Sequence, residues 1–216
     1  MRPLRIGVVG AGRVGAVLAA AFAASGHEVT AVSGRSAASK TRIETLLPGI
    51  PVRRPAEVAA DADLLLLAVP DDVLEPVAAE LVRAGSIGPG QLVAHTSGRH
   101  GTDVLAAARG AGAQVLAMHP AMTFTGTDID IGRLSTTVFA LTGDPSVREA
   151  GERIVADIGG TPIWLSEDQR VLYHAALAHG SNHLVTLVTQ AQSILRSAGT
   201  TDPSGVLRPL LTAALD

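Results

Sequence analysis

The sequence has no cysteine and very few aromatic residues. Its 216 residues include three Phe, one Trp and one Tyr, so aromatic residues make up 2% of the chain, while hydrophobic residues of all kinds make up 47%. The lack of cysteine excludes disulfide frameworks, thiolate nucleophiles and cysteine-type zinc sites. Because aromatic residues are so few, the hydrophobic core must be built from Ala, Leu and Val. The chain is long enough for one large domain or two small ones.

Long runs of one chemical character are also missing. Lys and Arg number 17 and Asp and Glu number 20, a net charge of −3, and no basic run could follow a phosphate backbone. The apolar run 64–69 ends at Pro70, far short of the roughly 18 residues that a membrane span needs. A strand pattern begins within four residues of the N-terminus, which leaves no room for a signal peptide. We therefore expect a cytoplasmic protein that binds neither nucleic acid nor a membrane.

The sequence does have a glycine-rich turn near its start. Residues 5–9 form a short strand pattern that runs into glycines spaced G-x-G-x-x-G, and an alanine-rich helix pattern follows. This context is typical of a turn that binds the diphosphate of a dinucleotide on the free N–H groups of the helix N-terminus. The residues expected to contact the cofactor are Gly10, Ala11, Gly12, Arg13, Val14 and Gly15. The alternative is a structural turn between strand and helix that binds no ligand.

The end of the second predicted strand, 28–32, indicates which cofactor binds. An NAD enzyme usually has an acidic residue there, roughly 20 residues past the glycines, to bind the ribose 2′-hydroxyl. This chain has Ser33, Arg35 and Ser36 instead. Hydroxyls and a guanidinium can hold a 2′-phosphate through charge-assisted hydrogen bonds, so we predict NADP rather than NAD. The alternative is that Ser33 and Ser36 only cap the next helix.

Strand and helix patterns then alternate, which predicts a doubly wound, mostly parallel sheet of the α/β class. Helices are expected over 37–47, 55–60, 72–83, 101–109 and 145–158, and strands over 52–54, 64–69, 91–94, 114–118, 136–141 and 161–165. Asp72 and Glu75 match a capping box at the start of one helix. After residue 166 only helical patterns remain, over 169–198 and after Pro203. We therefore expect a nucleotide-binding domain over 1–165 and a helical substrate or dimerisation domain over 166–216.

Polar residues follow two successive strands of this sheet. In such sheets ligands bind where the strands end at the carboxyl edge. Ala68, Val69 and Pro70 follow one strand and are expected beside the cofactor. The run His-Thr-Ser-Gly over 95–98 and the run His-Pro over 119–120 follow the next two strands. We expect Thr96 to contact the cofactor, and Ser97 and His119 to line the substrate side.

Several motifs together resemble a known family. They are the G-x-G-x-x-G turn, Ala-Val-Pro-Asp over 68–71, His-Thr-Ser-Gly over 95–98, His119-Pro120 with Thr123-Phe124, and Tyr-His-Ala-Ala over 173–176 leading to Ser181-Asn182. The chain resembles bacterial oxidoreductase-like proteins that pair a Rossmann-like domain with a helical domain of unknown function. They belong to the 6-phosphogluconate dehydrogenase and ketopantoate reductase-like superfamily. The resemblance covers essentially the whole chain and implies a Rossmann-type fold and NADP-dependent redox activity. The relatives continue past the position that matches Asp216, which implies an incomplete helical domain.

The same resemblance indicates catalytic candidates. Ketopantoate reductases carry a lysine and two asparagines at four-residue intervals on the helix after the Rossmann domain. If Asn182 matches the last of them, His174 takes the position of the lysine and Ala178 that of the middle asparagine. We expect His174 to act as the acid or base and Asn182 to orient the substrate. The alternative is that His174 is a hydrogen-bonded structural residue.

These observations predict an NADP-dependent reductase or dehydrogenase. Its expected substrate is a small polar carbonyl or hydroxy compound, bound in a cleft between the Rossmann unit and the helices. The alternative is a non-catalytic NADP-binding protein that serves as a sensor or in assembly. No metal is expected, because His179 and His183 have the spacing of a zinc pair but lack a third ligand. The apolar faces of the last helices need a partner, which is either a second subunit or a continuation of the natural chain. We expect a homodimer through that segment.

Overall fold

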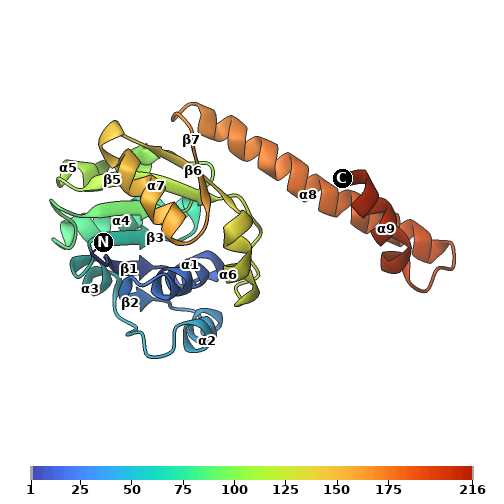
Figure 1. The fold of residues 1–216 in the computed structure, drawn as a ribbon, viewed down its shortest axis with the longest axis horizontal. Coiled ribbons are helices and arrows are strands. Elements are labelled where there is room, and N and C mark those ends of the chain that lie inside the picture. The colour runs from blue at the N-terminus through green and yellow to red at the C-terminus, as the bar shows by residue number, and fades with distance from the viewer. Residues whose placement is uncertain (1, 216) are drawn as a thin grey trace. The chain divides into compact units, whose positions relative to one another are not determined.

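The computed structural model describes residues 2–215 and contains one mixed sheet with the strand order β2-β1-β3-β4-β5-β6-β7 (Figure 1). Strands β1 to β5 are parallel to one another, whereas β6 runs antiparallel to β5 and parallel to β7. The predicted doubly wound, mostly parallel α/β class is confirmed. The strands are β1 (Arg5–Val9), β2 (Glu28–Ser33), β3 (Leu64–Leu67), β4 (Leu92–His95), β5 (Gln114–Pro120), β6 (Val138–Gly143) and β7 (Thr161–Trp164).

Helices cover both faces of the sheet, because alternate strand residues point to opposite faces and both are apolar. One core joins Ile6 and Val8 of β1 to the first set of helices, and the other joins Leu65 and Leu67 of β3 to the second set. The first set is α1 (Arg13–Ala24), α2 (Ala37–Leu46), α6 (Ile129–Arg133) and α7 (Arg148–Asp157). The second set is α3 (Pro55–Ala60), α4 (Asp71–Arg83) and α5 (Ala106–Gly110). Short 3-10 turns are η1 (Thr102–Leu105), η2 (Leu134–Thr136) and η3 (Pro145–Val147).

Several local predictions need correction. The predicted capping box at Asp72 is wrong, because α4 begins at Asp71 and its N-cap residue is Pro70, which offers no side-chain cap. The predicted strand 52–54 is reduced to a single bridge between Val52 and Val32. Strand β5 continues through His119 and Pro120, since antiparallel β6 pairs with it along its whole end. Helix α6 was not predicted.

The chain divides into two compact units, Met1–Val171 and Leu172–Asp216. Helix α8 (Gln169–Ser197) continues from the first unit into the second, and α9 (Pro203–Leu215) completes the second. Gly199, with φ +89, ends α8, and the N–H of Thr200 donates to the Leu195 carbonyl as in a Schellman motif. Gln192 then donates to the Ser204 hydroxyl across the hairpin that the two helices form.

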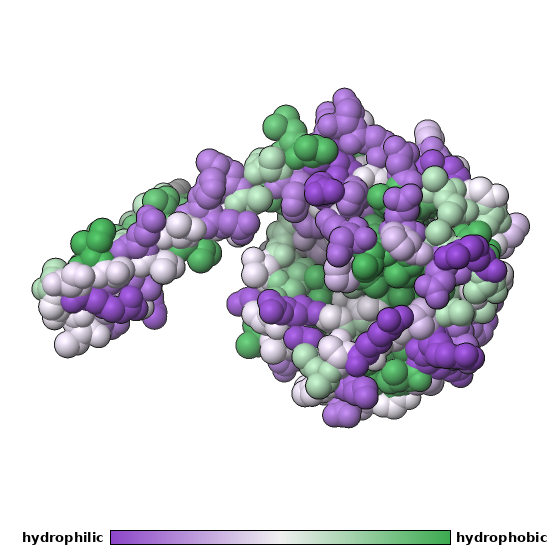
Figure 2. All heavy atoms as spheres, turned by 180° about the vertical axis from the view of Figure 1, so that it is seen from behind, coloured by the Kyte–Doolittle hydropathy of each residue, from purple (hydrophilic) through white to green (hydrophobic). Residues whose placement is uncertain are grey.

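The surface of this hairpin is mixed in polarity, with apolar side chains among polar ones (Figure 2). Leu187, Ile194 and Leu210 are each more than 60% exposed. Over residues 2–215, the structure has no helix that is both long and apolar enough to cross a membrane.

Candidate functional site

The glycine-rich turn occupies residues 10–12, between the end of β1 and the start of α1. Gly10 adopts φ +101, a conformation that residues with a side chain rarely take. A Cβ on Gly10 would also lie 2.5 Å from the Ala68 carbonyl oxygen, and a Cβ on Gly15 would lie 2.1 Å from the Gly10 carbonyl oxygen. Both glycines are therefore required by the packing of the turn against α1 and the end of β3.

Gly12 differs from these two glycines, because a Cβ at this position would meet no atom within 4 Å. Its φ is −75, so alanine could take the same backbone conformation. The folded chain itself does not need a glycine here. The missing side chain leaves open space at the N-terminus of α1.

The N-terminus of α1 has free hydrogen-bonding capacity. Among residues 2–215 no side chain caps the helix, and the first N–H of α1 with a backbone acceptor is that of Ala16, which donates to the Gly12 carbonyl at 3.1 Å. N–H groups at such a terminus carry positive potential and suit an anion. Open space at Gly12 together with uncapped N–H groups fits the diphosphate of a dinucleotide. The N–H groups of Arg13, Val14 and Gly15 would hold it beside the space at Gly12, whose own N–H already donates to the Gly10 carbonyl at 2.8 Å.

Ser33, at the end of β2, holds the backbone of the glycine turn through hydrogen bonds. Its carbonyl accepts from the N–H groups of Gly10 at 3.2 Å and Ala11 at 2.7 Å, and its hydroxyl accepts from the Gly10 N–H at 3.2 Å. Ser33 is buried, so it belongs to the floor of the turn rather than to a helix cap. Ser36 does cap the next helix, because its hydroxyl accepts from the Ser39 N–H at 3.0 Å.

Three arginines lie on segments that adjoin the turn. Arg13 begins α1, Arg35 follows β2, and Arg42 lies on α2. Within residues 2–215 none of the three has a carboxylate within 4.0 Å, whereas Arg5, Arg54 and Arg148 are each paired with one. The sequence indicates Arg13 and Arg35 but not Arg42, since no local pattern distinguishes Arg42 from other polar residues of a helix.

The end of β3 is in contact with the glycine turn. The Ala68 N–H donates to the Val9 carbonyl at 2.8 Å, and the Val69 side chain lies 3.0 Å from the Cβ position of Gly10. Pro70 follows as the N-cap residue of α4 and is exposed. The structure thus brings residues 68–70 together with the turn, although their contact with a cofactor stays a prediction.

The loop after β4 is held by buried side chains. Both ring nitrogens of His95 are used: Nδ1 accepts from the Ser97 N–H at 3.1 Å, and Nε2 bonds to the Gly101 carbonyl at 2.8 Å. Burial lowers the pKa of His95 to about 4, so the ring is neutral at pH 7 and its proton is on Nε2. His95 therefore has the structural role of holding this loop.

Arg170 and Glu167 hold the same loop from the start of α8. Arg170 is fully buried and donates to the Ser97 carbonyl at 2.7 Å and to the Thr142 hydroxyl at 3.0 Å. Glu167 accepts from the N–H of Thr102 at 2.8 Å. The sequence analysis missed both residues, because a lone charged residue near the start of a helix usually lies in solvent.

These contacts determine what the predicted residues of the loop can do. The Ser97 hydroxyl accepts from the His100 N–H at 3.1 Å and the side chain is buried, so the hydroxyl helps to close the loop. Thr96 is half-buried, and its N–H donates to the Leu67 carbonyl at 3.3 Å. His119 is half-buried at the end of β5, and Ser97 lies at the same level because His95 is in register with Ala117. The sheet brings Thr96, Ser97 and His119 to one edge.

His174 and Asn182 lie in the second unit, on α8. The helix is continuous through Gly180, so His174, Ala178 and Asn182 share one face as the sequence predicts. His174 is half-buried and Asn182 is exposed. Their catalytic roles stay predictions.

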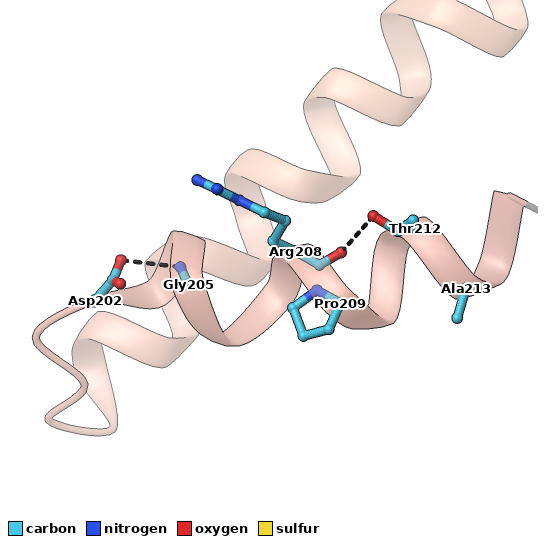
Figure 3. Close-up of a pocket in the computed structure, with 6 residues that line it drawn as sticks. All are labelled: Asp202, Gly205, Arg208, Pro209, Thr212 and Ala213. Carbon is cyan, nitrogen blue, oxygen red and sulfur yellow. Dashed lines mark hydrogen bonds between the residues drawn. The ribbon is translucent and has the colours of Figure 1, made fainter.

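The second unit also has a shallow hollow of about 600 Å³ on α9 (Figure 3). Asp202 closes its start by accepting from the Gly205 N–H at 2.9 Å, which caps α9, and the Thr212 hydroxyl donates to the Arg208 carbonyl at 3.0 Å. The lining residues are Asp202, Gly205, Arg208, Pro209, Thr212 and Ala213. The Asp202 carboxylate and the Thr212 hydroxyl already bond to the backbone of the helix, so the glycine turn is the stronger candidate site.

Comparison with known families agrees with this geometry. A family model described as a Rossmann-like domain matches residues 1–120, which is more than half of the chain. The chain belongs to the Rossmann-like family. A second model, described as a domain of unknown function (DUF2520), matches residues 137–216 of this Rossmann-like protein. The predicted resemblance to a Rossmann-like domain followed by a helical domain of unknown function is confirmed.

Solved structures share the fold of this Rossmann-like protein. A provisionally named NADP oxidoreductase of Bacteroides fragilis is 19% identical, with a TM-score of 0.79 over 98% of this chain and 78% of its own. A reductive aminase of Aspergillus terreus, solved with NADPH, is 21% identical, with a TM-score of 0.73 over 99% of this chain and 74% of its own. A pyrroline carboxylate reductase of Plasmodium falciparum, solved with NADP bound, is 15% identical, with a TM-score of 0.71 over 100% of this chain and 78% of its own. At these identities the likeness shows a common fold.

A relative with higher sequence identity covers a smaller part. The glycerol-3-phosphate dehydrogenase (NAD(P)+) of Trichlorobacter lovleyi is 38% identical in an alignment 109 residues long, and the match covers 44% of this chain and 31% of that protein. The Rossmann-like protein thus matches only about a third of the length of this relative.

Proposed function

We propose that this chain is an NADP-dependent oxidoreductase that transfers a hydride between NADP(H) and a small polar carbonyl or hydroxy compound. The observation that carries the proposal is the cradle at the first turn, where Gly12 leaves open space over the uncapped N-terminus of α1. The reductases solved with NADP or NADPH that share the fold support the choice of cofactor class. When bound, the nicotinamide would supply or accept the hydride.

The residues of this chain have three tasks in the proposed function. The N–H groups at the start of α1 bind the diphosphate. Arg35, which has no carboxylate partner within residues 2–215, binds the 2′-phosphate with Ser36. His174 holds and moves a proton at its imidazole, and Asn182 orients the substrate.

Thr96, Ser97 and His119 lie at the carboxyl edge of the sheet, where ligands of doubly wound folds bind. We assign Thr96 to cofactor contact, and Ser97 and His119 to the substrate side. Because Ser97 is buried and its hydroxyl closes a loop, its part is to fix the shape of this edge.

Two measurements test the proposal. Titration with NADPH and with NADH, followed by nicotinamide fluorescence, is expected to show tighter binding of NADPH. Arg35→Gln should remove about tenfold of that preference, as expected for the loss of one charge-assisted hydrogen bond. Equal affinity of the unchanged protein for both nucleotides would contradict the choice of NADP.

Turnover is tested separately, by screening small ketoacids with NADPH for the unchanged protein and for His174→Ala. The expected result is activity that falls at least 100-fold in the variant, as is typical when a general acid is lost. Activity that survives the substitution would exclude His174 as the acid or base. Nucleotide binding without any turnover would instead support the alternative, an NADP-binding sensor or assembly protein.

The proposal includes a homodimer through the helical hairpin and a cytoplasmic location. The exposed side chains of Leu187, Ile194 and Leu210 support the dimer, because apolar residues on a helix face are stabilised when a partner covers them.

A further inference from the structure

The loop between β5 and α6 is firmly anchored. The side chain of Asp130 is fully buried and accepts from the N–H groups of Thr125 and Gly126, each at 2.8 Å, and from the Thr125 hydroxyl at 3.0 Å. Phe124 is buried in the core beside the first set of helices. The carboxylate and the ring therefore fix the backbone of the loop at Gly126.

Gly126 lies directly against two arginines from other elements. A Cβ on Gly126 would be 2.6 Å from Arg42 Nε and 3.0 Å from Arg13 Cγ. Gly126 also has φ +83, so its conformation favours glycine on its own account. The anchored loop thus holds the stems of Arg13 and Arg42 together, although 29 residues separate the two in the sequence.

The guanidinium of Arg42 has a backbone hydrogen bond but, among the described residues, no carboxylate partner. Its Nη1 donates to the Ala38 carbonyl at 3.2 Å, and the side chain is half-buried. Within the described residues no carboxylate lies within 4.0 Å of it, and the same holds for Arg13 and Arg35. Three arginines without a carboxylate partner among residues 2–215, on segments that adjoin one turn in a chain of net charge −3, favour an anionic ligand over a structural ion pair.

We propose that Arg42, positioned by Gly126, is a second phosphate-binding arginine of the cofactor site. The inference rests on the proposed function, because the phosphate belongs to the dinucleotide. Arg13 directly follows Gly12 in the sequence, and Gly126 packs against both Arg13 and Arg42. Arg35 lies two residues after Ser33, whose carbonyl accepts from the N–H groups of the turn. The ligand group is a phosphate of the cofactor, either the 2′-phosphate or the diphosphate.

The test is a fluorescence titration of the full chain with NADPH and with NADH. Arg42→Gln is expected to weaken NADPH binding about tenfold. Unchanged NADH affinity would assign Arg42 to the 2′-phosphate, and an equal loss for both nucleotides would assign it to the diphosphate. The matched control is Lys40→Gln, which removes the same charge from an exposed position of α2. It should change either affinity less than twofold.

Two outcomes separate this inference from the proposed function. If the unchanged protein binds neither nucleotide, the proposed function fails. If it binds NADPH and Arg42→Gln binds both nucleotides as tightly as before, only the inference is overturned. A loss of the same size in Lys40→Gln would also overturn it, because the effect would then come from general charge.

A second variant separates the loss of a phosphate contact from a loss of folded structure. Arg42→Lys keeps the charge and the stem but loses the planar fork, so it should bind NADPH more tightly than Arg42→Gln and less tightly than the unchanged protein. Trp164, the single tryptophan, lies in the same unit, and its fluorescence reports whether each variant is folded. Folded variants with an affinity equal to that of the unchanged protein would contradict the role of Arg42.

Discussion

Gly15→Ala should lower the free energy of unfolding, whereas Gly12→Ala should weaken the binding of NADPH without lowering the free energy of unfolding. The two glycines nevertheless belong to one motif. A Cβ on Gly15 would lie 2.1 Å from the Gly10 carbonyl oxygen and 2.9 Å from the Cβ of the half-buried Ala68, and neither a backbone carbonyl nor a Cβ can swing aside. Overpacking of this kind costs about 1–3 kcal/mol. The gain in helix propensity from glycine to alanine, up to about 1 kcal/mol, offsets only part of it. For a chain of this length, 1 kcal/mol corresponds to about 2–4 °C in Tm.

Gly12→Ala should leave the free energy of unfolding unchanged or slightly raised, because nothing lies within 4 Å of the new methyl group and φ is −75. Alanine at such a position stabilises by about 0.4–1 kcal/mol through the unfolded chain. The methyl group would, however, fill the space that the diphosphate needs. Affinity for NADPH should therefore fall at least tenfold while the Tm stays the same.

Thermal unfolding followed by Trp164 fluorescence gives the stability of the first unit, and NADPH titration gives the affinity. Gly88→Ala is the matched control, because its Cβ also meets nothing within 4 Å and it lies outside the turn. It should change neither quantity. The reasoning is refuted if Gly12→Ala binds NADPH as tightly as the unchanged protein, or if Gly15→Ala unfolds at an unchanged temperature.

Two further predictions concern the loop after β4. The pKa of His95 is about 4 in the folded chain and about 6.5 in the unfolded chain, so only the unfolded state gains this proton as the pH falls from 6.5 to 4. This one group should lower the free energy of unfolding by about 3 kcal/mol over that pH range. Denaturant unfolding of His95→Gln should show a smaller decrease between pH 6.5 and pH 4. A pH dependence identical to that of the unchanged protein would contradict the lowered pKa of His95. Arg170→Lys should lower the Tm of the Trp164 transition by about 2–12 °C, since one ammonium group cannot replace the fork that serves Ser97 and Thr142. Arg196→Lys, at an exposed position of α8, should leave that Tm unchanged.

The sequence predicted those features that depend on neighbouring residues. The spacing of Gly10, Gly12 and Gly15 encodes a turn whose geometry is local, and the alternation of patterns encodes the doubly wound sheet. The antiparallel pairing of β6 with β5 was not predicted, because strand direction is decided by the path of the chain through α6. The predicted capping box at Asp72 failed because Pro70 already fixes the start of α4 one residue earlier.

The sequence could not predict contacts that depend on folding at long range. Arg170 reaches the Ser97 carbonyl across 73 residues of chain, and Gly126 meets an arginine of α2. Asp130 is fully buried, although its neighbours in sequence suggest an exposed polar segment. Each of these groups looks like an ordinary surface residue until the sheet places its partner beside it.

Ser33 shows how the turn limits the choice of cofactor. Its hydroxyl oxygen already accepts from the Gly10 N–H, so it can offer a 2′-phosphate only its single proton. A hydroxyl in that position would serve a ribose 2′-hydroxyl about as well, so Ser33 by itself favours neither NADP nor NAD. Discrimination must come from groups whose charge acts on the phosphate alone, and the candidates at this edge are Arg35 and Arg42. If both were replaced by glutamine, the preference for NADPH over NADH should disappear. A preference that survived the double substitution would place the recognition of the phosphate elsewhere.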